Sequence, residues 1–66
     1  MVNLEKINYL IVEKGLKRKE IANYFNWSAS CVARKLNGER QIKTNELFKM
    51  AKLLDVDIKE LYKEDV

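Results

Sequence analysis

The sequence predicts a compact all-α fold built from five short helices, and two observations support this expectation. Apolar residues recur at spacings of three and four along the chain, which places them on one face of a helix. Residues typical of helix ends separate these stretches, namely Gly15, Asn26 and Asn37-Gly38, and no stretch reads as a strand. Helices this short are expected to cross at steep angles around one shared core.

The first two helices are expected over 4–14 and 18–25. Asn3 is a suitable cap for the first, and Gly15 ends it. Asn26 follows the second helix, where a left-handed residue allows the chain to turn sharply into Trp27. The expected inward residues are Leu4, Ile7, Leu10 and Ile11 in the first helix, and Ile21, Ala22 and Phe25 in the second.

Three further helices are expected in the second half of the chain. Ser28 caps a third helix over 29–36, and either Thr44 or Asn45 caps a fourth that runs to Leu54. Asp57 opens a short fifth helix that includes Leu61 and Tyr62, because Glu60 follows it at capping-box spacing. The expected inward residues are Val32 and Leu36 in the third helix, and Leu47, Met50, Ala51 and Leu54 in the fourth.

Length and composition exclude several classes of protein. A chain of 66 residues is expected to form a single domain over 1–66, with little room for an enclosed catalytic cleft beside its core. One Cys and no His leave no internal disulfide and no usual zinc or general-base site, so neither enzyme activity nor a cofactor or metal is expected. Without a membrane-length apolar run or a signal-peptide pattern, we expect a cytoplasmic protein that binds no membrane and no small molecule.

Positive charge is concentrated in the middle of the chain. Residues 17–43 contain seven basic and two acidic residues, a net charge of +5, whereas residues 1–16 are neutral and residues 44–66 carry −2. This distribution favours a polyanionic partner. Charge alone leaves a solvated, lysine-rich surface as an equal alternative.

Several segments, in order, resemble the phage Cro and repressor (Xre-type) helix-turn-helix family. The similar residues are Gly15 to Ala22, Asn26-Trp27-Ser28, Asn37 to Arg40, and Leu47 to Leu61. The short turn between the helices over 18–25 and 29–36 also favours a helix-turn-helix, because it does not allow an antiparallel hairpin. The resemblance implies a five-helix, lambda-repressor-like domain whose helix over 29–36 enters the major groove of DNA, and a dimer bound to inverted repeats.

The resemblance also implies which residues contact DNA. The base-reading positions correspond to Arg18, Ala29, Ser30, Ala33 and Arg34, and the phosphate-binding positions to Ser28, Asn37, Arg40 and Lys43. Arg34 is the main candidate, because its planar guanidinium can donate twice to guanine, although a phosphate contact is the alternative. Ser30 suits a base or a phosphate, and the two alanines suit a thymine methyl group.

The sequence departs from the family pattern at the start of the helix over 18–25. Arg18 replaces a frequent Gln, and its charge suits a phosphate as well as a base. Lys17 replaces a short polar cap, so this helix is expected to be poorly capped. A lysine at a positive helix end is favourable only beside an anion, and we therefore add Lys17 to the phosphate-binding residues.

Two nearby residues allow both a structural and a functional interpretation. Trp27 is suited to stacking on a base, but packing is the favoured interpretation for a turn between two core helices. Cys31 has the position of a redox-sensitive thiol near DNA, but a small residue that packs on the helix is the commoner case.

The end of the chain carries more apolar residues than so small a core is expected to enclose. We therefore expect a homodimer whose interface contains Leu54, Val56, Ile58, Leu61 and Tyr62. Together these features predict a sequence-specific DNA-binding transcription regulator of phage, mobile-element or restriction-control type, with repression as the expected action. The alternative is a protein-interaction module of the same fold, such as an antitoxin or antirepressor-like adaptor, although the basic charge argues against it.

Overall fold

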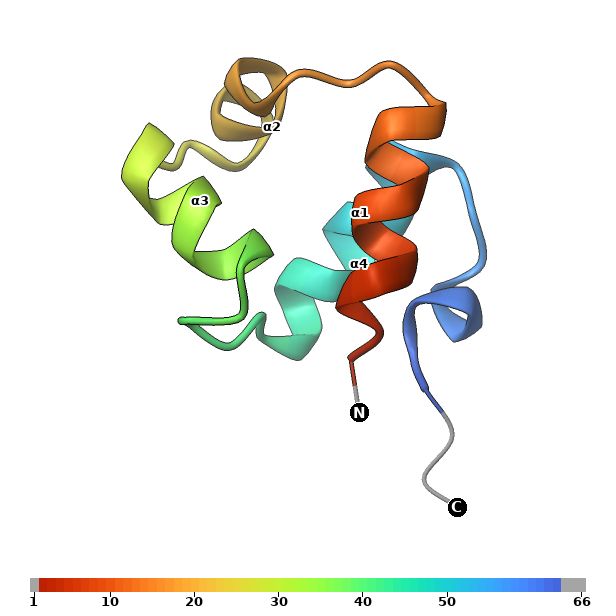
Figure 1. Cartoon of the computed structure of the whole chain (residues 1–66). Helices are drawn as coiled ribbons and strands as arrows, with labels where there is room; N and C mark the ends of the chain where they lie inside the picture. The colour runs from red at the N-terminus through yellow and green to blue at the C-terminus, as the bar shows by residue number, and fades with distance from the viewer. Residues whose placement is uncertain (1, 64–66) are drawn as a thin grey trace.

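The computed structural model describes residues 2–63 and contains four α-helices followed by one short 3-10 helix (Figure 1). These elements are α1 Leu4–Glu13, α2 Arg18–Phe25, α3 Ala29–Leu36, α4 Thr44–Leu54 and η1 Ile58–Leu61. Within the described range the extended backbone pairs only at one isolated bridge, between Val2 and Tyr62. The all-α prediction is therefore confirmed, but the count of five α-helices is not.

The expected fifth helix is a four-residue 3-10 helix. It begins as predicted at Asp57, whose side chain accepts a hydrogen bond from the backbone N–H of Lys59 at 2.9 Å. It does not include Tyr62, whose backbone is extended (φ −111°, ψ 143°). The chain here pairs with the segment before α1, where the N–H of Asn3 donates to the carbonyl of Leu61 at 2.8 Å. This pairing explains why the helix ends after a single turn.

The apolar core receives side chains from every helix. Ile11 of α1 and Leu36 of α3 are both buried in it. The buried apolar residues are Ile7, Leu10, Ile11, Ile21, Val32, Leu36, Ile42, Leu47, Met50, Ala51, Leu54 and Leu61.

The turn between α2 and α3 sets the position of α3. Asn26 adopts the predicted left-handed conformation (φ 59°, ψ 40°), and the N–H of Trp27 closes the helix end on the carbonyl of Ala22 at 2.9 Å. The chain then enters α3 at its cap, Ser28. Figure 1 shows α2 and α3 together on one side of the molecule, while α1 lies in front of α4 on the other.

Two helices have a lysine as the N-cap residue, where the usual capping acceptor is absent. Lys17 precedes α2 as expected, but Lys43 precedes α4, so the prediction of Thr44 or Asn45 as the cap was wrong. A lysine side chain has no acceptor to offer the free N–H groups of the first turn. In both helices the acidic residue at the third position accepts the lysine N–H instead, at 3.2 Å for Glu20 and 2.9 Å for Glu46. The glutamate carboxylate supplies the missing acceptor and places a negative charge at the positive end of the helix, which explains why a lysine can serve as the N-cap residue.

Candidate nucleic-acid interface

The outer face of α3 carries the residues expected to read bases. Ala29, Ser30 and Arg34 are exposed and Ala33 is half-buried. Val32 and Leu36 lie on the opposite face, and both are buried in the core. The packing of α3 on α2 therefore leaves a polar and methyl-bearing face accessible, with a guanidinium in the last turn of the helix.

Ser28 stands at the start of this face. Its hydroxyl accepts the N–H of Cys31 at 3.1 Å, which caps α3. A hydroxyl that accepts a hydrogen bond still has its own proton to donate, and Ser28 is exposed. The capping serine is therefore able to donate to a phosphate oxygen while it continues to cap the helix.

The loop after α3 is anchored to the helix by its backbone. The carbonyl of Arg34 accepts the N–H of Glu39 at 2.9 Å and that of Arg40 at 3.3 Å. Gly38 allows this tight return, because its φ of +84° is rarely adopted by residues with a side chain. The loop therefore holds the exposed residues Asn37 and Arg40 directly beside the end of α3.

Asn8 of α1 also secures the end of α3. Its amide donates to the carbonyl of Leu36 at 3.1 Å and to the carbonyl of Leu4 at 3.0 Å. The last carbonyls of a helix have no partner within the helix. One side chain of α1 thus satisfies a free carbonyl of α3 and attaches the end of α3 to the rest of the fold.

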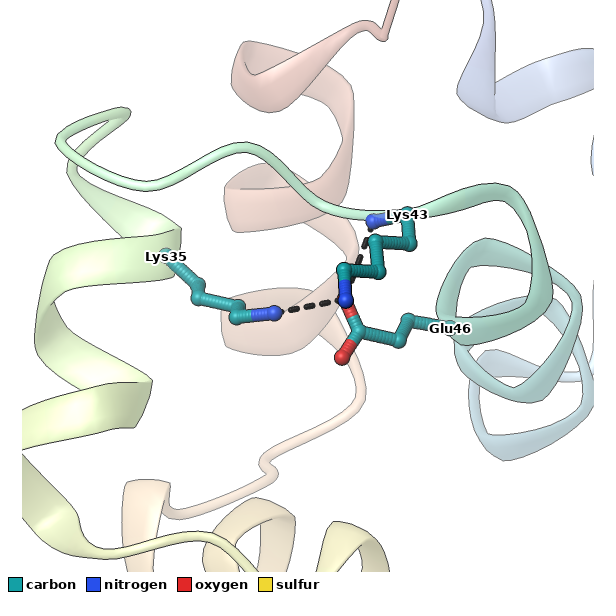
Figure 2. Close-up of polar contacts among 3 residues, drawn as sticks. All are labelled: Lys35, Lys43 and Glu46. Atoms are coloured by element: carbon teal, nitrogen blue, oxygen red, sulfur yellow. Dashed lines mark hydrogen bonds and ion pairs between the residues drawn. The ribbon is translucent and has the colours of Figure 1, made fainter.

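Lys43 is connected to α3 through Glu46, as Figure 2 shows. One carboxylate oxygen of Glu46 accepts the ammonium of Lys35 at 2.6 Å and the backbone N–H of Lys43 at 2.9 Å. Burial acts to raise the pKa of Glu46, but hydrogen bonds from Lys35 and Lys43, together with their charges, bring it below its ordinary value of 4.5. Glu46 is therefore an anion at neutral pH, held between α3 and the start of α4.

Lys17 and Arg18 occupy a separate position at the start of α2. Both side chains are exposed, and within residues 2–63 no side-chain hydrogen bond or ion pair joins them to the other expected contacts. The carboxylate of Glu20 lies beside them, since it accepts the N–H of Lys17. Hydrogen bonds thus connect the expected contact residues of α3, its following loop and the start of α4, whereas those at the start of α2 are connected to them through the packing of α2 on α3 and the short turn between the two helices.

Trp27 packs within the molecule, as its favoured interpretation predicted. Its ring stacks on Phe25 with a centroid distance of 4.2 Å and an interplanar angle of 12°. The ammonium of Lys35 lies 4.7 Å from the centroid of the Trp27 ring, within the range of a cation–π interaction. Cys31 is half-buried on α3, which fits its interpretation as a packing residue.

The comparison with protein families agrees with this geometry. A family model described as helix-turn-helix, of Cro and C1 (Xre-like) type, matches residues 7–61. The chain belongs to this family. It is a family of DNA-binding regulators and not a class of enzymes, so membership supports DNA binding and transcription regulation. No curated protein and no solved structure matched the chain.

Residues 2–63 contain no group of three or more His, Cys, Asp or Glu side chains placed to hold a metal ion. In the same range, no helix is both long and apolar enough to cross a membrane.

The structure changes the surface expected to form the dimer. Leu54 and Leu61 are fully buried in the core, so they are not available to a second chain. Val56 and Ile58 are half-buried, and Tyr62 is exposed. These last three leave a smaller apolar surface than the sequence suggested. A further residue, which the sequence analysis missed, is Phe48 of α4, whose side chain is 55% exposed.

The sequence analysis also missed three polar residues that connect the elements of the candidate interface by hydrogen bonds, namely Asn8, Lys35 and Glu46. Glu46 has a recognisable signal, because it lies three residues after Lys43 as a capping-box acid does. Lys35 and Asn8 have no such signal. Their partners lie 11 and 28 residues away, and only the packing of helices brings them together.

Proposed function

We infer that this chain is a sequence-specific transcription repressor that binds an inverted-repeat operator as a homodimer, with α3 in the major groove of each half-site. The proposal rests on the outer face of α3, where Arg34 and Ser30 are exposed beside a backbone-anchored loop that carries Arg40. The charge of +5 over residues 17–43 falls on the same part of the molecule. Repression rather than activation follows from the resemblance to Cro and phage repressors.

We propose that one set of residues in this interface reads bases and that a second set binds phosphates. Arg34 and Ser30 read base edges by hydrogen bonding, and Ala29 and Ala33 contact thymine methyl groups. Arg18, at the start of α2, reads a base or binds a phosphate. The proposed phosphate-binding residues are Lys17, Ser28, Asn37, Arg40 and Lys43. Most protein contacts to DNA are of this second kind, and they set the position of the helix in the groove.

Selection of bound sites from random double-stranded DNA tests the proposed function. We expect enrichment of an inverted repeat whose half-site centres are about one helical turn, or 34 Å, apart. Enrichment of a single unrepeated site would contradict the dimeric mode of binding. Absence of any enriched sequence would contradict specific recognition and would favour the alternative, a protein-interaction module of the same fold.

The surface proposed for the dimer is a shallow hollow at the end of α4. Phe48, Val56 and Ile58 supply its apolar part, while Lys52, Asp55 and Asp57 supply charges of both signs at the same place. A two-fold axis brings the same surface of each chain together, so that Lys52 of one copy can face an Asp of the other. The hollow therefore suits a second copy of this chain. Tyr62 is kept as a further proposed contact outside the hollow.

We expect Phe48→Glu to weaken the free dimer by about tenfold or more, because the interface would have to bury an unpaired carboxylate. The exposure of Phe48 makes this change tolerable to the monomer fold. Val12→Glu is the matched control, since Val12 is 79% exposed on α1 and outside the hollow. Sedimentation of the free proteins and of their complexes with a two-half-site duplex measures the effect. One chain per duplex for the unmodified protein, or equal dimerisation of both variants, would show that the interface lies elsewhere.

A further inference from the structure

Lys35 differs from the other basic residues of α3 and its following loop because it is buried. It is 7% exposed, and it is the one charged residue buried to this degree within residues 2–63. Burying an ammonium is costly unless it is paired. Lys35 has two partners: the carboxylate of Glu46, with Nζ to Oε1 at 2.6 Å, and the face of Trp27, at 4.7 Å from the centroid. These contacts direct its ammonium toward the protein and away from an approaching phosphate.

The partners of Lys35 belong to different parts of the fold. Trp27 lies in the turn before α3 and stacks on Phe25 of α2, whereas Glu46 lies in the first turn of α4. α3 packs on α2, and its buried residues Val32 and Leu36 belong to the same apolar core as Leu47 of α4. The pair formed by Lys35 and Glu46 adds a polar connection between α3 and the start of α4, which Figure 2 shows between the two helices.

The electrostatic consequence concerns Lys43. Glu46 stabilises the start of α4 by accepting the N–H of Lys43, but it also places a carboxylate beside a residue proposed to bind phosphate. An uncompensated carboxylate at that place would repel DNA. The ammonium of Lys35 is hydrogen-bonded to the same oxygen that accepts Lys43 N–H, and it neutralises that charge from the side of the protein.

We propose that Lys35 is a positioning residue of the DNA interface, which neutralises Glu46 and fixes the start of α4, with Lys43, relative to α3. Lys35 itself touches no DNA. This inference rests on the proposed DNA-binding function. It distinguishes two lysines that look alike in sequence: Lys43 contacts phosphate, whereas Lys35 neutralises the carboxylate beside that contact.

The test measures DNA affinity and its salt dependence for a set of variants on the site selected from random DNA. Lys35→Met removes the charge but keeps the length of the side chain, and Glu46→Gln keeps an oxygen to accept the N–H of Lys43. Lys43→Met removes a proposed phosphate contact, and Lys14→Met removes an exposed charge at the end of α1 as the control. Circular dichroism and chemical denaturation verify that each variant folds, with Lys35→Gln as the replacement if Lys35→Met does not.

We expect Lys35→Met to lower affinity about tenfold at low salt, and by less as the salt concentration rises, because salt screens the repulsion between DNA and the uncompensated carboxylate of Glu46. Lys43→Met lowers the affinity and also reduces the slope by about 0.9 for each half-site. Adding Glu46→Gln to Lys35→Met restores most of the affinity, because the uncompensated carboxylate is gone. Lys14→Met changes neither quantity.

Four results would overturn the proposal. A reduced slope for Lys35→Met that persists when Glu46→Gln is added would make Lys35 itself a phosphate contact. Unchanged affinity, or an affinity loss that Glu46→Gln does not restore, would leave Lys35 with a structural role alone. If the unmodified protein bound no duplex, the proposed function would fail and this inference with it, whereas normal binding with unaffected Lys35 variants would overturn the inference alone.

Discussion

Raising the salt concentration from about 50 to 200 mM is expected to weaken the operator complex of this protein by about ten-thousandfold. Each chain offers four exposed cations to phosphates, namely Lys17, Arg18, Arg40 and Lys43. A dimer would therefore neutralise about eight phosphates, which gives a slope of log K against log salt of about −7. Ser28 and Asn37 are neutral, so they are expected to add hydrogen bonds but no counterion release.

Fluorescence anisotropy of a labelled operator over a range of salt concentrations measures this slope. Arg40→Met removes one exposed cation from each chain and should make the slope less steep by about 1.8 for the dimer. Lys14→Met serves again as the control, because Lys14 lies outside the proposed interface. Affinity that hardly changes between these salt concentrations would contradict the DNA-binding function itself.

The fold was largely predictable because its helices follow short-range rules. Helical spacing identified the apolar residues of α1 to α4 that are buried, and Asn26 allowed the turn of the helix-turn-helix to be placed correctly. Two helix ends were predicted wrongly, for different reasons. Pairing of the segments near the two ends of the chain restricts η1 to one turn, which local spacing does not reveal. Lys43 is the cap of α4 because Glu46, three residues later, accepts its N–H, and this short-range signal was overlooked.

The candidate site was predictable only in part. The exposure of Ser30 and Arg34 follows from the burial of Val32 and Leu36 on the opposite face of α3, which the spacing already required. Spacing and charge do not predict that Lys35 is buried, because its neighbour Arg34 carries the same charge and is exposed. Its burial depends on Trp27 and Glu46, which reach it from two other elements. Spacing likewise does not show how many apolar side chains the core can enclose. For this reason Leu54 and Leu61 were predicted to lie in an interface, although both are buried in the core.

Arg34→Ala is expected to weaken binding to the selected operator by about 1 to 3 kcal/mol for each half-site. A bidentate contact to guanine O6 and N7 would be lost, so the preference at one base pair of each half-site should be relaxed. The substitution leaves the backbone carbonyl of Arg34 in place, and this carbonyl holds the N–H groups of Glu39 and Arg40. The loop after α3 should therefore keep its position, and the effect should be confined to the lost guanidinium.

Arg34→Lys separates the two roles that an exposed arginine can have on this helix. Lysine keeps the positive charge but lacks the planar pair of donors that matches guanine. If Arg34 reads a base, repeated site selection should show weakened preference at the same base pair for both variants, and Arg34→Lys should keep nearly all of the affinity for random DNA. If Arg34 binds a phosphate, Arg34→Lys should behave like the unmodified protein, while Arg34→Ala should lose affinity equally on operator and random DNA and show a smaller salt slope. That second pattern would move base recognition to Arg18 and Ser30, because the remaining expected reading positions of α3 carry only methyl groups.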